Sequence, residues 1–444
     1  MFIATLLVAC APVLVAGAMS NFQGTLPQAT AYFVSATGSD GSPGTSPSAP
    51  WRTWTKVTAA ASSGAFADGD SIRFQAGGVY SGAGGILTTL DLTFETYGSG
   101  PRARIEGSGT VAMFVFHGGS ISTVRDLDIT NNGAIATGAK IVQTSGVGTD
   151  VTISNSWLHR ARGGVNCADG AHTLVIGCLI EDLYLDGTAG NGVGAVIETT
   201  DCLIRRCGLA AALDGNSTGD GCTTHQSAVN HVVRCIIIDC NKGITHVNTS
   251  GTSMIKDSII LMDDIGWATG TGGQSPPWLR WGINQTFGAS MEIDNVIVGI
   301  LGTQPLVCIN NSSGLNQNIR HSTLVNANSH VSSAIIVVAG SNTSMRVRSC
   351  FFSGLSTSSI FWASDGAPGQ IHRTAHNCYS PVLYPTNAGA QFLTGSVPIS
   401  WDVWQTFSGE FDSIASPDLL PLAFGNGANA DPVFPTRALS LMGF

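Results

Sequence analysis

The chain has 444 residues, of which 43% are hydrophobic, only 11% are charged and 55 are glycines. This composition is typical of an elongated protein built from strands and glycine-rich turns, and it argues against a mainly helical protein. The formal net charge of −9, with only four lysines, argues against nucleic acid as a partner. It also argues against a strongly anionic polymer as a partner, unless a metal ion mediates the contact.

The first 19 residues contain no charged side chain and include the small-residue sequence Ala16-Gly17-Ala18. An apolar start that ends in small residues is typical of a secretory signal peptide, here with cleavage after Ala18. No Lys or Arg follows Met1, however, and Pro12 interrupts the apolar run. Residues 1–18 are therefore predicted to be a signal peptide, with an anchoring segment or a buried cap as alternatives. The signal peptide favours a secreted or extracellular-surface protein, and the anchoring alternative a virion surface.

The following segment carries a resemblance to a known family. It contains YFVSATGSDGSPGTSPSAPWRTW from Tyr32 to Trp54, then GDSI from Gly69 and QAGGVYSG. These motifs resemble the N-terminal region of right-handed parallel β-helix proteins of the pectate-lyase-like superfamily. The stretch ISWDVWQTFSGEFDSIASPDLL from Ile399 is similar to the segment that closes many exported members. The resemblance implies an N-terminal cap with a strand and a short helix at about Trp54 to Ala61, but no single activity, because the superfamily includes lyases, hydrolases, epimerases, tailspikes and adhesins.

One short phrase recurs nine times between Leu127 and Cys350. A ladder residue is followed two positions later by an apolar residue, as in LDITNN from Leu127, SWLHRA from Ser156, CLIEDL from Cys178, CLIRRC from Cys202, CIIIDC from Cys235, SIILMD from Ser258, NVIVGI from Asn295, STLVNA from Ser322 and CFFSGL from Cys350. An offset of two places both side chains on one face of a strand. The ladder residues are 22 (Ser156 to Cys178) to 37 (Ser258 to Asn295) positions apart, without a convincing amphipathic helix between them. This spacing is typical of a stacked repeat array.

Together with the resemblance, the repeat predicts an all-β fold, a single-stranded right-handed parallel β-helix. Its N-terminal strand and capping region, with the short helix, is expected at residues 32–85, its coils at 86–382 and an irregular C-terminal capping segment at 383–444. The alternative is a β-sandwich, which does not keep an aligned column through this many units. In the solenoid, five isoleucines are expected to form one buried axial stack: Ile180, Ile204, Ile237, Ile260 and Ile297.

Cysteines occupy several ladder positions. Cys178, Cys202 and Cys235 are consecutive ladder residues, and Cys207 and Cys240 share the next column. The first three are expected to point inward at equivalent corners of successive coils. Stacking could bring Cys202 near Cys235, and Cys207 near Cys240, but buried free thiols that pack as small hydrophobic groups are favoured over disulfides. No CxxC pair or His-rich spacing indicates zinc.

A turn that often ends in glycine follows each phrase and leads into another strand. Four of these glycines are expected to align, namely Gly164, Gly221, Gly243 and Gly282. The residues two positions beyond them would then form one outward polar row, the predicted floor of a groove: Asn166, Thr223, Thr245 and Asn284.

Two long turns precede this strand, Gly208 to Asp220 and Asp264 to Trp281, and they are expected to build walls beside the floor. Tryptophan faces stack on sugar rings and carboxylates bind hydroxyl groups, so the predicted partner is a polysaccharide or cell-surface glycan. At least one of Trp278 and Trp281 should be exposed along the groove. The predicted substrate-binding residues are Asn166, Asp214, Thr223, Thr245, Trp267, Trp278, Trp281 and Asn284.

The predicted catalytic residues are Asp220, His225, Asp263, Asp264 and Arg280. Glycoside hydrolysis needs one carboxylic acid and one carboxylate, and Asp220 with Asp263 or Asp264 is the best such pair. A lyase would instead use His225, Arg280 and Lys242 as base and electrophilic partners beside a cation, for which Ca²⁺ is the candidate. Each residue also has a plain structural role, because Asp-Gly pairs are ordinary turn dipeptides and the tryptophans could simply cover the stack.

Two functions follow. The first is an exported or surface-displayed polysaccharide lyase or glycoside hydrolase. The alternative is a non-catalytic glycan-binding or adhesive protein, such as a phage tailspike or receptor-binding protein, for which a trimer would be expected. A purely structural surface protein would leave the two long turns unexplained.

Overall fold

The computed structural model describes residues 28–131, 139–208, 219–248, 250–263, 280–286, 290–302, 306–312, 316–327, 334–338 and 345–354, and beyond these the strands between 359 and 415. The predicted signal peptide and most of the predicted C-terminal capping segment lie outside the described residues.

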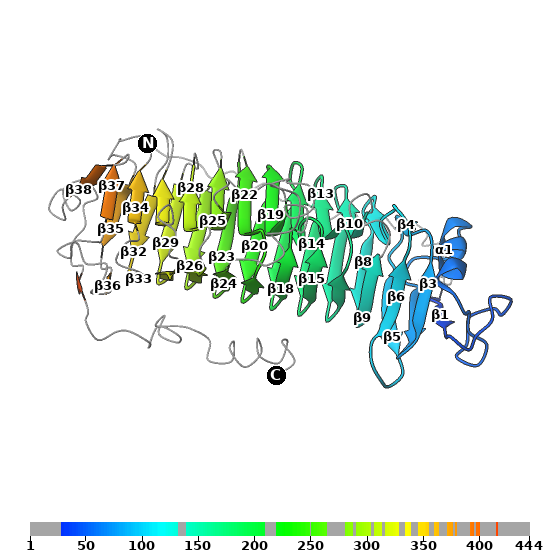
Figure 1. The fold of residues 1–444 in the computed structure, drawn as a ribbon. Coiled ribbons are helices and arrows are strands. Elements are labelled where there is room, and N and C mark those ends of the chain that lie inside the picture. Colours follow the sequence, from blue (N-terminus) through cyan, green and yellow to red (C-terminus); the bar gives the residue numbers. More distant parts are fainter. Residues whose placement is uncertain are drawn as a thin grey trace, which may run out of the picture.

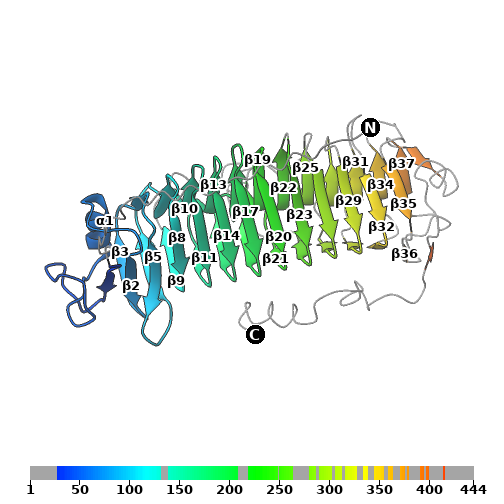
Figure 2. The same cartoon turned by 180° about the vertical axis from the view of Figure 1, so that it is seen from behind.

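The chain winds into coils that stack into three sheets of 13 strands, here called A, B and C (Figures 1 and 2). Sheet A contains β1 (Ala31–Val34), β2 (Ser71–Gln75), β5 (Thr93–Tyr97), β8 (Ile121–Arg125), β11 (Asp150–Ser154), β14 (His172–Ile176), β17 (Val196–Thr200), β20 (Val229–Val233), β23 (Thr252–Lys256), β26 (Ser290–Asp294), β29 (Asn316–Arg320), β32 (Met345–Arg348) and β35 (Ile371–Ala375). Sheet B contains β3 (Val79–Gly82), β6 (Ala103–Gly107), β9 (Leu127–Asn131), β12 (Trp157–His159), β15 (Leu179–Leu183), β18 (Leu203–Cys207), β21 (Ile236–Ile238), β24 (Ile259–Met262), β27 (Ile297–Ile300), β30 (Thr323–Asn326), β33 (Phe351–Gly354), β36 (Cys378–Tyr379) and β39 (Ile414–Ala415). Sheet C contains β4 (Ile86–Thr88), β7 (Phe114–His117), β10 (Lys140–Ser145), β13 (Gly163–Ala168), β16 (Thr188–Asn191), β19 (Asp220–Gln226), β22 (Lys242–Asn248), β25 (Arg280–Thr286), β28 (Leu306–Asn311), β31 (Ala334–Val338), β34 (Ser359–Ala363), β37 (Gln391–Thr394) and β38 (Val397–Ile399).

The strands pair in parallel from coil to coil, and an antiparallel pair, β37 with β38, stands at the far end of sheet C. The predicted all-β parallel β-helix is therefore confirmed. Strand pairing already begins with β1 and β2, inside the region that the sequence assigned to the cap.

The helix α1 (Trp54–Ser62) lies at the N-terminal end of the solenoid, where the sequence predicted it (Figure 1). It begins there because the Thr53 hydroxyl accepts a hydrogen bond from the Lys56 backbone N–H at 3.1 Å, as an N-cap residue does. Trp54 is fully buried, and its indole N–H donates to the Gly84 carbonyl at 3.1 Å. The helix thereby closes the open end of the hydrophobic core. Among the described residues, no helix is both long enough and apolar enough to cross a bilayer.

The axial stack exists, with one correction. Ile180, Ile204, Ile237 and Ile260 pair in sequence and are fully buried, but the next member is Val298. Ile297 pairs instead with an outward residue of β24 and is only half-buried. The prediction for Ile297 was therefore wrong by one residue, and in a strand a slip of one residue reverses the face.

The reason for the slip lies at the corner between sheets A and B. Here each coil has a residue with positive φ directly before its ladder residue, as in Asp201 (54°), Arg234 (51°) and Asp257 (51°). Asn295 has φ 56°, so it occupies this corner position, and Val296 is the ladder residue. Asn tolerates the left-handed conformation well, which explains its use at this corner.

The remaining ladder follows the prediction. Cys178, Cys202 and Cys235 are buried, and the Cys178 backbone N–H donates to the Cys202 sulfur at 3.4 Å. Two coils further, the Cys235 N–H donates to the Ser258 hydroxyl at 3.1 Å. A small side chain with a lone pair suits this corner because it can satisfy a backbone donor of the preceding coil, as Cys202 and Ser258 do. The nine cysteines whose side chains the structure describes are all free thiols.

Candidate active site

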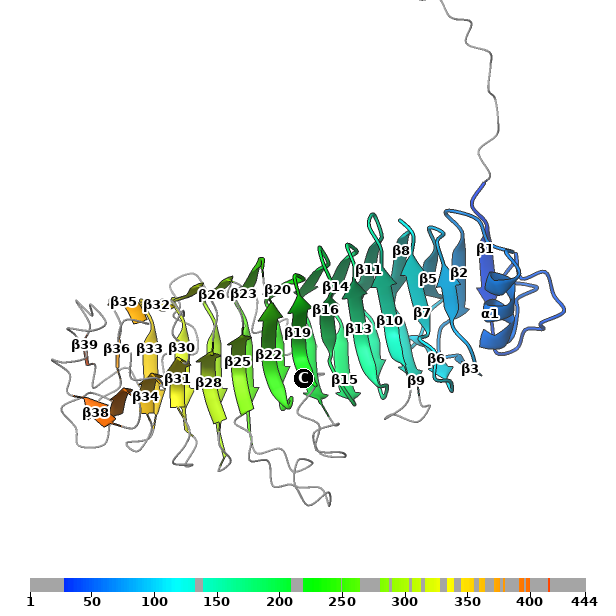
Figure 3. The ribbon, with the colours of Figure 1, turned by 90° about the horizontal axis from the view of Figure 1, so that it is seen from above.

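The predicted groove floor lies on the outer face of sheet C, which Figure 3 shows from β10 to β34. Thr223 pairs with Thr245, which pairs with Asn284, and Asn166 joins the same row through Ala189. The residue before each predicted floor residue belongs to the hydrophobic core, so the row faces outward. The four predicted side chains are nevertheless at most 5% exposed. The floor is therefore covered rather than open to solvent.

A column of five glycines forms one edge of this face: Gly164, Gly187, Gly221, Gly243 and Gly282. A Cβ atom added at any of the first four would lie 2.3 to 2.7 Å from the carbonyl oxygen of the next glycine. Only glycine permits such a close approach of successive coils. Four of these glycines were predicted to align from the sequence, and Gly187 is a fifth member of the column.

The residues directly before these glycines bring charges together at the edge of sheet C. The Asp220 backbone N–H donates to Asp186 Oδ1 at 3.0 Å. Asp220 pairs with Lys242, whose Nζ lies 3.9 Å from Asp220 Oδ1. The same ammonium lies over the Trp281 ring, 5.2 Å from its centroid. Two carboxyl groups, a lysine and a tryptophan thus follow one another along the solenoid axis.

Lys140 lies on the N-terminal side of this column, on β10. It pairs with Gly163, and its Nζ donates to Asn166 Oδ1 at 2.5 Å. The side-chain amide of Asn191 donates to the same oxygen. A lysine therefore flanks the carboxyl pair at each end, and Asn166 anchors one of them. We call Lys140, Asp186, Asp220, Lys242 and Trp281 the sheet C cluster.

The environment of the cluster favours the neutral form of its carboxyl groups. Burial raises the pKa of Asp220 to about 6; the Lys242 charge opposes this shift and the Asp186 charge reinforces it. Burial also raises the pKa of Asp186, against the hydrogen bond from the Asp220 N–H and the charges of Lys140 and Lys242. Burial lowers the pKa of Lys140, and the Asp186 charge opposes that shift. Two interacting carboxyl groups of this kind titrate as a pair.

His225 lies on the same face as Asp220 and Thr223, near the C-terminal end of β19. Its ring is exposed, and its Nε2 lies 3.4 Å from the Thr223 hydroxyl oxygen. The solvent-accessible ring is thus two residues from the covered floor. Among the predicted residues that the structure describes on this face, His225 is exposed to solvent, whereas the four floor residues are buried.

Arg280 and Asp263 lie at the turn between sheets B and C. The Arg280 guanidinium is 5% exposed and donates to the carbonyl oxygens of Cys240, Asn241 and Asp263 at 2.8, 2.9 and 3.0 Å. Asp263 itself is exposed and directly follows β24. Arg280 therefore binds together two successive turns, and this geometry gives it a positioning role.

The carboxyl group that the structure places beside Asp220 is Asp186, which the sequence analysis did not single out, and Lys140 was missed as well. The available signal was the dipeptide Asp186-Gly187, which matches Asp220-Gly221 one coil later. The short coil around it lacks the long turn that drew attention to the others. Four further predicted residues lie outside the described residues: Asp214, Asp264, Trp267 and Trp278.

The residues at this site do not fit a calcium ion. Within the described ranges, no group of three or more His, Cys, Asp or Glu side chains is arranged to hold a metal. Calcium needs six to eight oxygen ligands, whereas the carboxyl pair here has a lysine on either side.

No protein-family model matches this chain, and no curated protein matches it in sequence. Solved structures are similar to it in fold. One is XylC in complex with xylose, with 11% identity, a TM-score of 0.52 and coverage of 88% of this chain and 87% of that chain. Another is the Dettilon tailspike protein, with 11% identity, a TM-score of 0.50 and coverage of 76% of this chain and 63% of that chain. These similarities agree with the parallel β-helix fold that the strand pairing shows.

Proposed function

We propose that this chain is an exported or surface-displayed carbohydrate-active protein that hydrolyses a polysaccharide at the Asp186 and Asp220 pair. The observation that carries the proposal is this pair of adjacent carboxyl groups with raised pKa values, held between two lysines on one face of the solenoid. A hydrolase needs one carboxyl group that is protonated near neutral pH and a second that is ionised. Because the pKa values of both carboxyl groups are raised, one member can keep its proton while the other is ionised.

In the proposed reaction the protonated member of the pair donates its proton to the glycosidic oxygen as the bond to the sugar carbon breaks. The ionised member stabilises the positive charge that develops on the sugar. It then either takes a proton from the water that attacks that carbon, or attacks the carbon itself; in the second case water hydrolyses the resulting ester and gives its proton to the first carboxyl group. Lys140 and Lys242 stabilise the ionised state, and Trp281 offers a face to a sugar ring at one end of the cluster. Arg280 acts as a positioning residue, because its guanidinium binds the backbone carbonyls of Asn241 and Asp263 and so fixes the start of β25, where Trp281 lies.

The β-elimination route has less support. A lyase must neutralise a uronate and remove a proton. Arg280, which was predicted to help with this, instead donates hydrogen bonds to three backbone carbonyls. Ca²⁺ is the candidate cation for this route, and among the described residues no group of acidic side chains is arranged to bind it.

A specific observation favours the second function, a non-catalytic glycan-binding or spike protein. Asp220 is only 4% exposed, so the carboxyl with the pKa near 6 is covered in this conformation. The similar folds of a tailspike and of a protein solved with xylose support a glycan partner for either function. Secretion or display on a virion, and a trimer in the latter case, belong to this proposal.

The experiment is a screen of the purified chain against a panel of polysaccharides, with reducing ends and unsaturated-uronate absorbance followed in parallel. We expect new reducing ends without unsaturated products. Asp186→Asn and Asp220→Asn should each reduce kcat by roughly 10²-fold to 10⁴-fold, while Asp150→Asn, an exposed carboxyl on sheet A, should leave it unchanged. Retention of a glycan without cleavage would support the binding function instead, and full activity of both Asn variants would refute the assignment of the site.

A further inference from the structure

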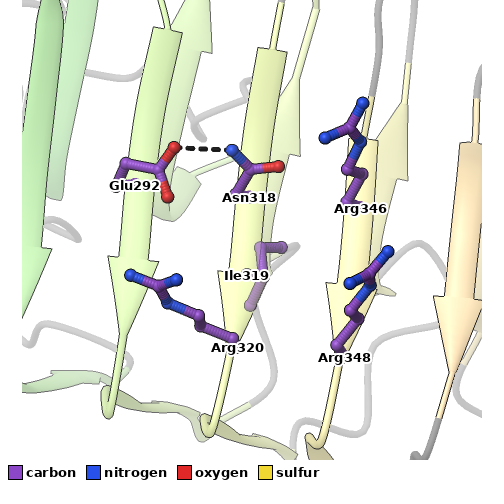
Figure 4. Close-up of a pocket in the computed structure, with 6 residues that line it drawn as sticks. All are labelled: Glu292, Asn318, Ile319, Arg320, Arg346 and Arg348. Atoms are coloured by element: carbon purple, nitrogen blue, oxygen red, sulfur yellow. Dashed lines mark hydrogen bonds between the residues drawn. The ribbon is translucent and has the colours of Figure 1, made fainter.

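The outer face of sheet A carries a hollow far along the solenoid, over β26, β29 and β32. It has a volume of about 260 Å³ (Figure 4). Six residues line it: Glu292, Asn318, Ile319, Arg320, Arg346 and Arg348. It lies on a different sheet from the sheet C cluster, so it is a separate place on the molecule.

Strand register sets the charges of this hollow in two rows. Glu292 pairs with Asn318, which pairs with Arg346, and in the second row Arg320 pairs with Arg348. All these residues alternate with buried ones along their strands and therefore face outward. Residues two apart on a strand are about 7 Å apart, so the guanidinium groups of Arg346 and Arg348 can approach one anion together.

The acidic residues near the hollow already have partners. Glu292 Oε1 accepts a hydrogen bond from the Asn318 amide at 2.5 Å (Figure 4). On the same strand as Glu292, Asp294 forms an ion pair with Arg320, with 3.3 Å between Oδ2 and Nε, and its Oδ1 lies 2.9 Å from His321 Nδ1.

Arg346 and Arg348 differ from Arg73, Arg125 and Arg320 on the same sheet. Within the part of the chain that the structure describes, neither has an ion pair or a hydrogen bond to a carboxylate, and both are exposed. On the same sheet near the N-terminus, by contrast, Arg73 and Arg125 both bind Glu95. Two neighbouring guanidinium groups without a counter-charge repel each other, and an anion bound between them would remove that repulsion.

We propose that this hollow binds the carboxylate of an acidic sugar residue in a glycan. The guanidinium group is planar and matches a carboxylate with two parallel hydrogen bonds, which favours Arg346 and Arg348 as the carboxylate ligands. The amide of Asn318 and the carboxylate of Glu292 offer a donor and an acceptor suited to sugar hydroxyl groups. The carboxylate of Glu292 in the wall would repel a free inorganic anion, so it disfavours a simple anion site. The proposal does not depend on the sheet C cluster.

The test measures binding of an oligogalacturonate to the full chain by calorimetry at low salt, beside a neutral oligosaccharide of equal length. We expect binding of the acidic oligosaccharide, and a loss of at least roughly tenfold in affinity when Arg346→Ala and Arg348→Ala are combined, since charge-assisted bidentate contacts are lost. Arg346→Lys combined with Arg348→Lys keeps the charges but not the planar donors. Its affinity should lie between that of the native chain and that of the double Ala variant. All variants are to be checked for an unchanged circular dichroism spectrum.

The matched control combines Arg73→Ala with Arg125→Ala, which removes the same charge from the same sheet at its other end. It should bind the oligogalacturonate like the native chain. Equal weakening by both double variants would reduce the effect to net charge and overturn the proposal. Binding of a sulfated oligosaccharide or of inorganic sulfate in preference to the carboxylated one would overturn the carboxylate assignment. Because the readout is binding, it is independent of whether the sheet C cluster cleaves any substrate.

Discussion

Sheets B and C both bury carboxyl groups on their outer faces, but they surround them differently. On sheet B, Glu181 is 3% exposed and accepts hydrogen bonds from Arg205, Arg206 and the Trp157 indole N–H at 2.5, 2.7 and 2.9 Å. On sheet C, Asp220 is equally buried, but its neighbours are the carboxyl of Asp186 and an ammonium 3.9 Å away.

This comparison shows that the partners, not the depth of burial, decide what a carboxyl group contributes. For Asp128 on sheet B, burial would raise the pKa, but the hydrogen bonds from His159 and Arg104 outweigh burial and lower it. For Asp220, burial prevails. Carboxylates that bind arginine or histidine stabilise the solenoid. Two neighbouring carboxyl groups destabilise each other's ionised form, and such unfavourable arrangements are common at functional sites.

The largest effect on stability should come from breaking the sheet B network. Glu181→Ala removes a buried carboxylate and leaves two arginines without it, so it should lower the free energy of unfolding by about 3 kcal/mol. Urea denaturation at neutral pH measures this change. The control is Glu198→Ala, whose carboxylate is 43% exposed and only 3.5 Å from a His172 nitrogen, and which should change stability by less than about 0.5 kcal/mol. Equal effects of the two variants would contradict the comparison.

A change of opposite sign is expected on sheet C. The folded pKa of Asp220, about 6, lies above its unfolded value of 3.8. The folded state therefore holds more protons between these values, and stability falls as the pH rises from about 4 to about 6. Asp220→Asn removes this cost, so the variant should be more stable than the native chain by about 1–2 kcal/mol above pH 6, and by little at pH 4. A thermal melt at each pH measures the difference, and a variant that is less stable at high pH would show that Asp220 is paired after all.

The axial core could be predicted from the sequence because every coil repeats the same two-residue offset, and one face of each strand is apolar. The prediction was wrong only at Ile297, where Asn295 imitates a ladder residue although it takes the corner conformation with φ 56°. Alternation in NVIVGI fits both registers, so the sequence alone cannot decide between them.

The site was harder to predict, because its geometry comes from stacking between coils rather than from local sequence. Asp220 was found through its long turn, but its partner Asp186 lies 34 residues earlier in a short coil. Arg280 looks like a substrate ligand in the sequence, and only the folded turns show which three carbonyl oxygens it binds. The sequence did not indicate a site at Arg346 and Arg348 of sheet A, since no phrase of the repeat contains them.

The smallest expected effect concerns a carboxylate at the rim of the sheet B network. Asp182 is 33% exposed and accepts Arg206 Nε at 2.6 Å; burial would raise its pKa, but this hydrogen bond and the Arg206 charge outweigh burial and lower it. A lowered folded pKa contributes stability above the unfolded value of 3.8, and this contribution is lost as the pH falls through the folded pKa.

Asp182→Asn is the suitable change because Asp182 has φ 55°, which Asn tolerates and Ala does not, so the backbone stays unstrained. The variant should lose about 0.5 kcal/mol at neutral pH, and less in concentrated salt, since the pair is open to solvent. Urea denaturation at low and at high salt measures both values. A loss as large as that of Glu181→Ala would mean that the rim and the centre of the network act as one unit, and a loss that salt leaves unchanged would mean that the side-chain hydrogen bond, rather than the charge, carries the effect.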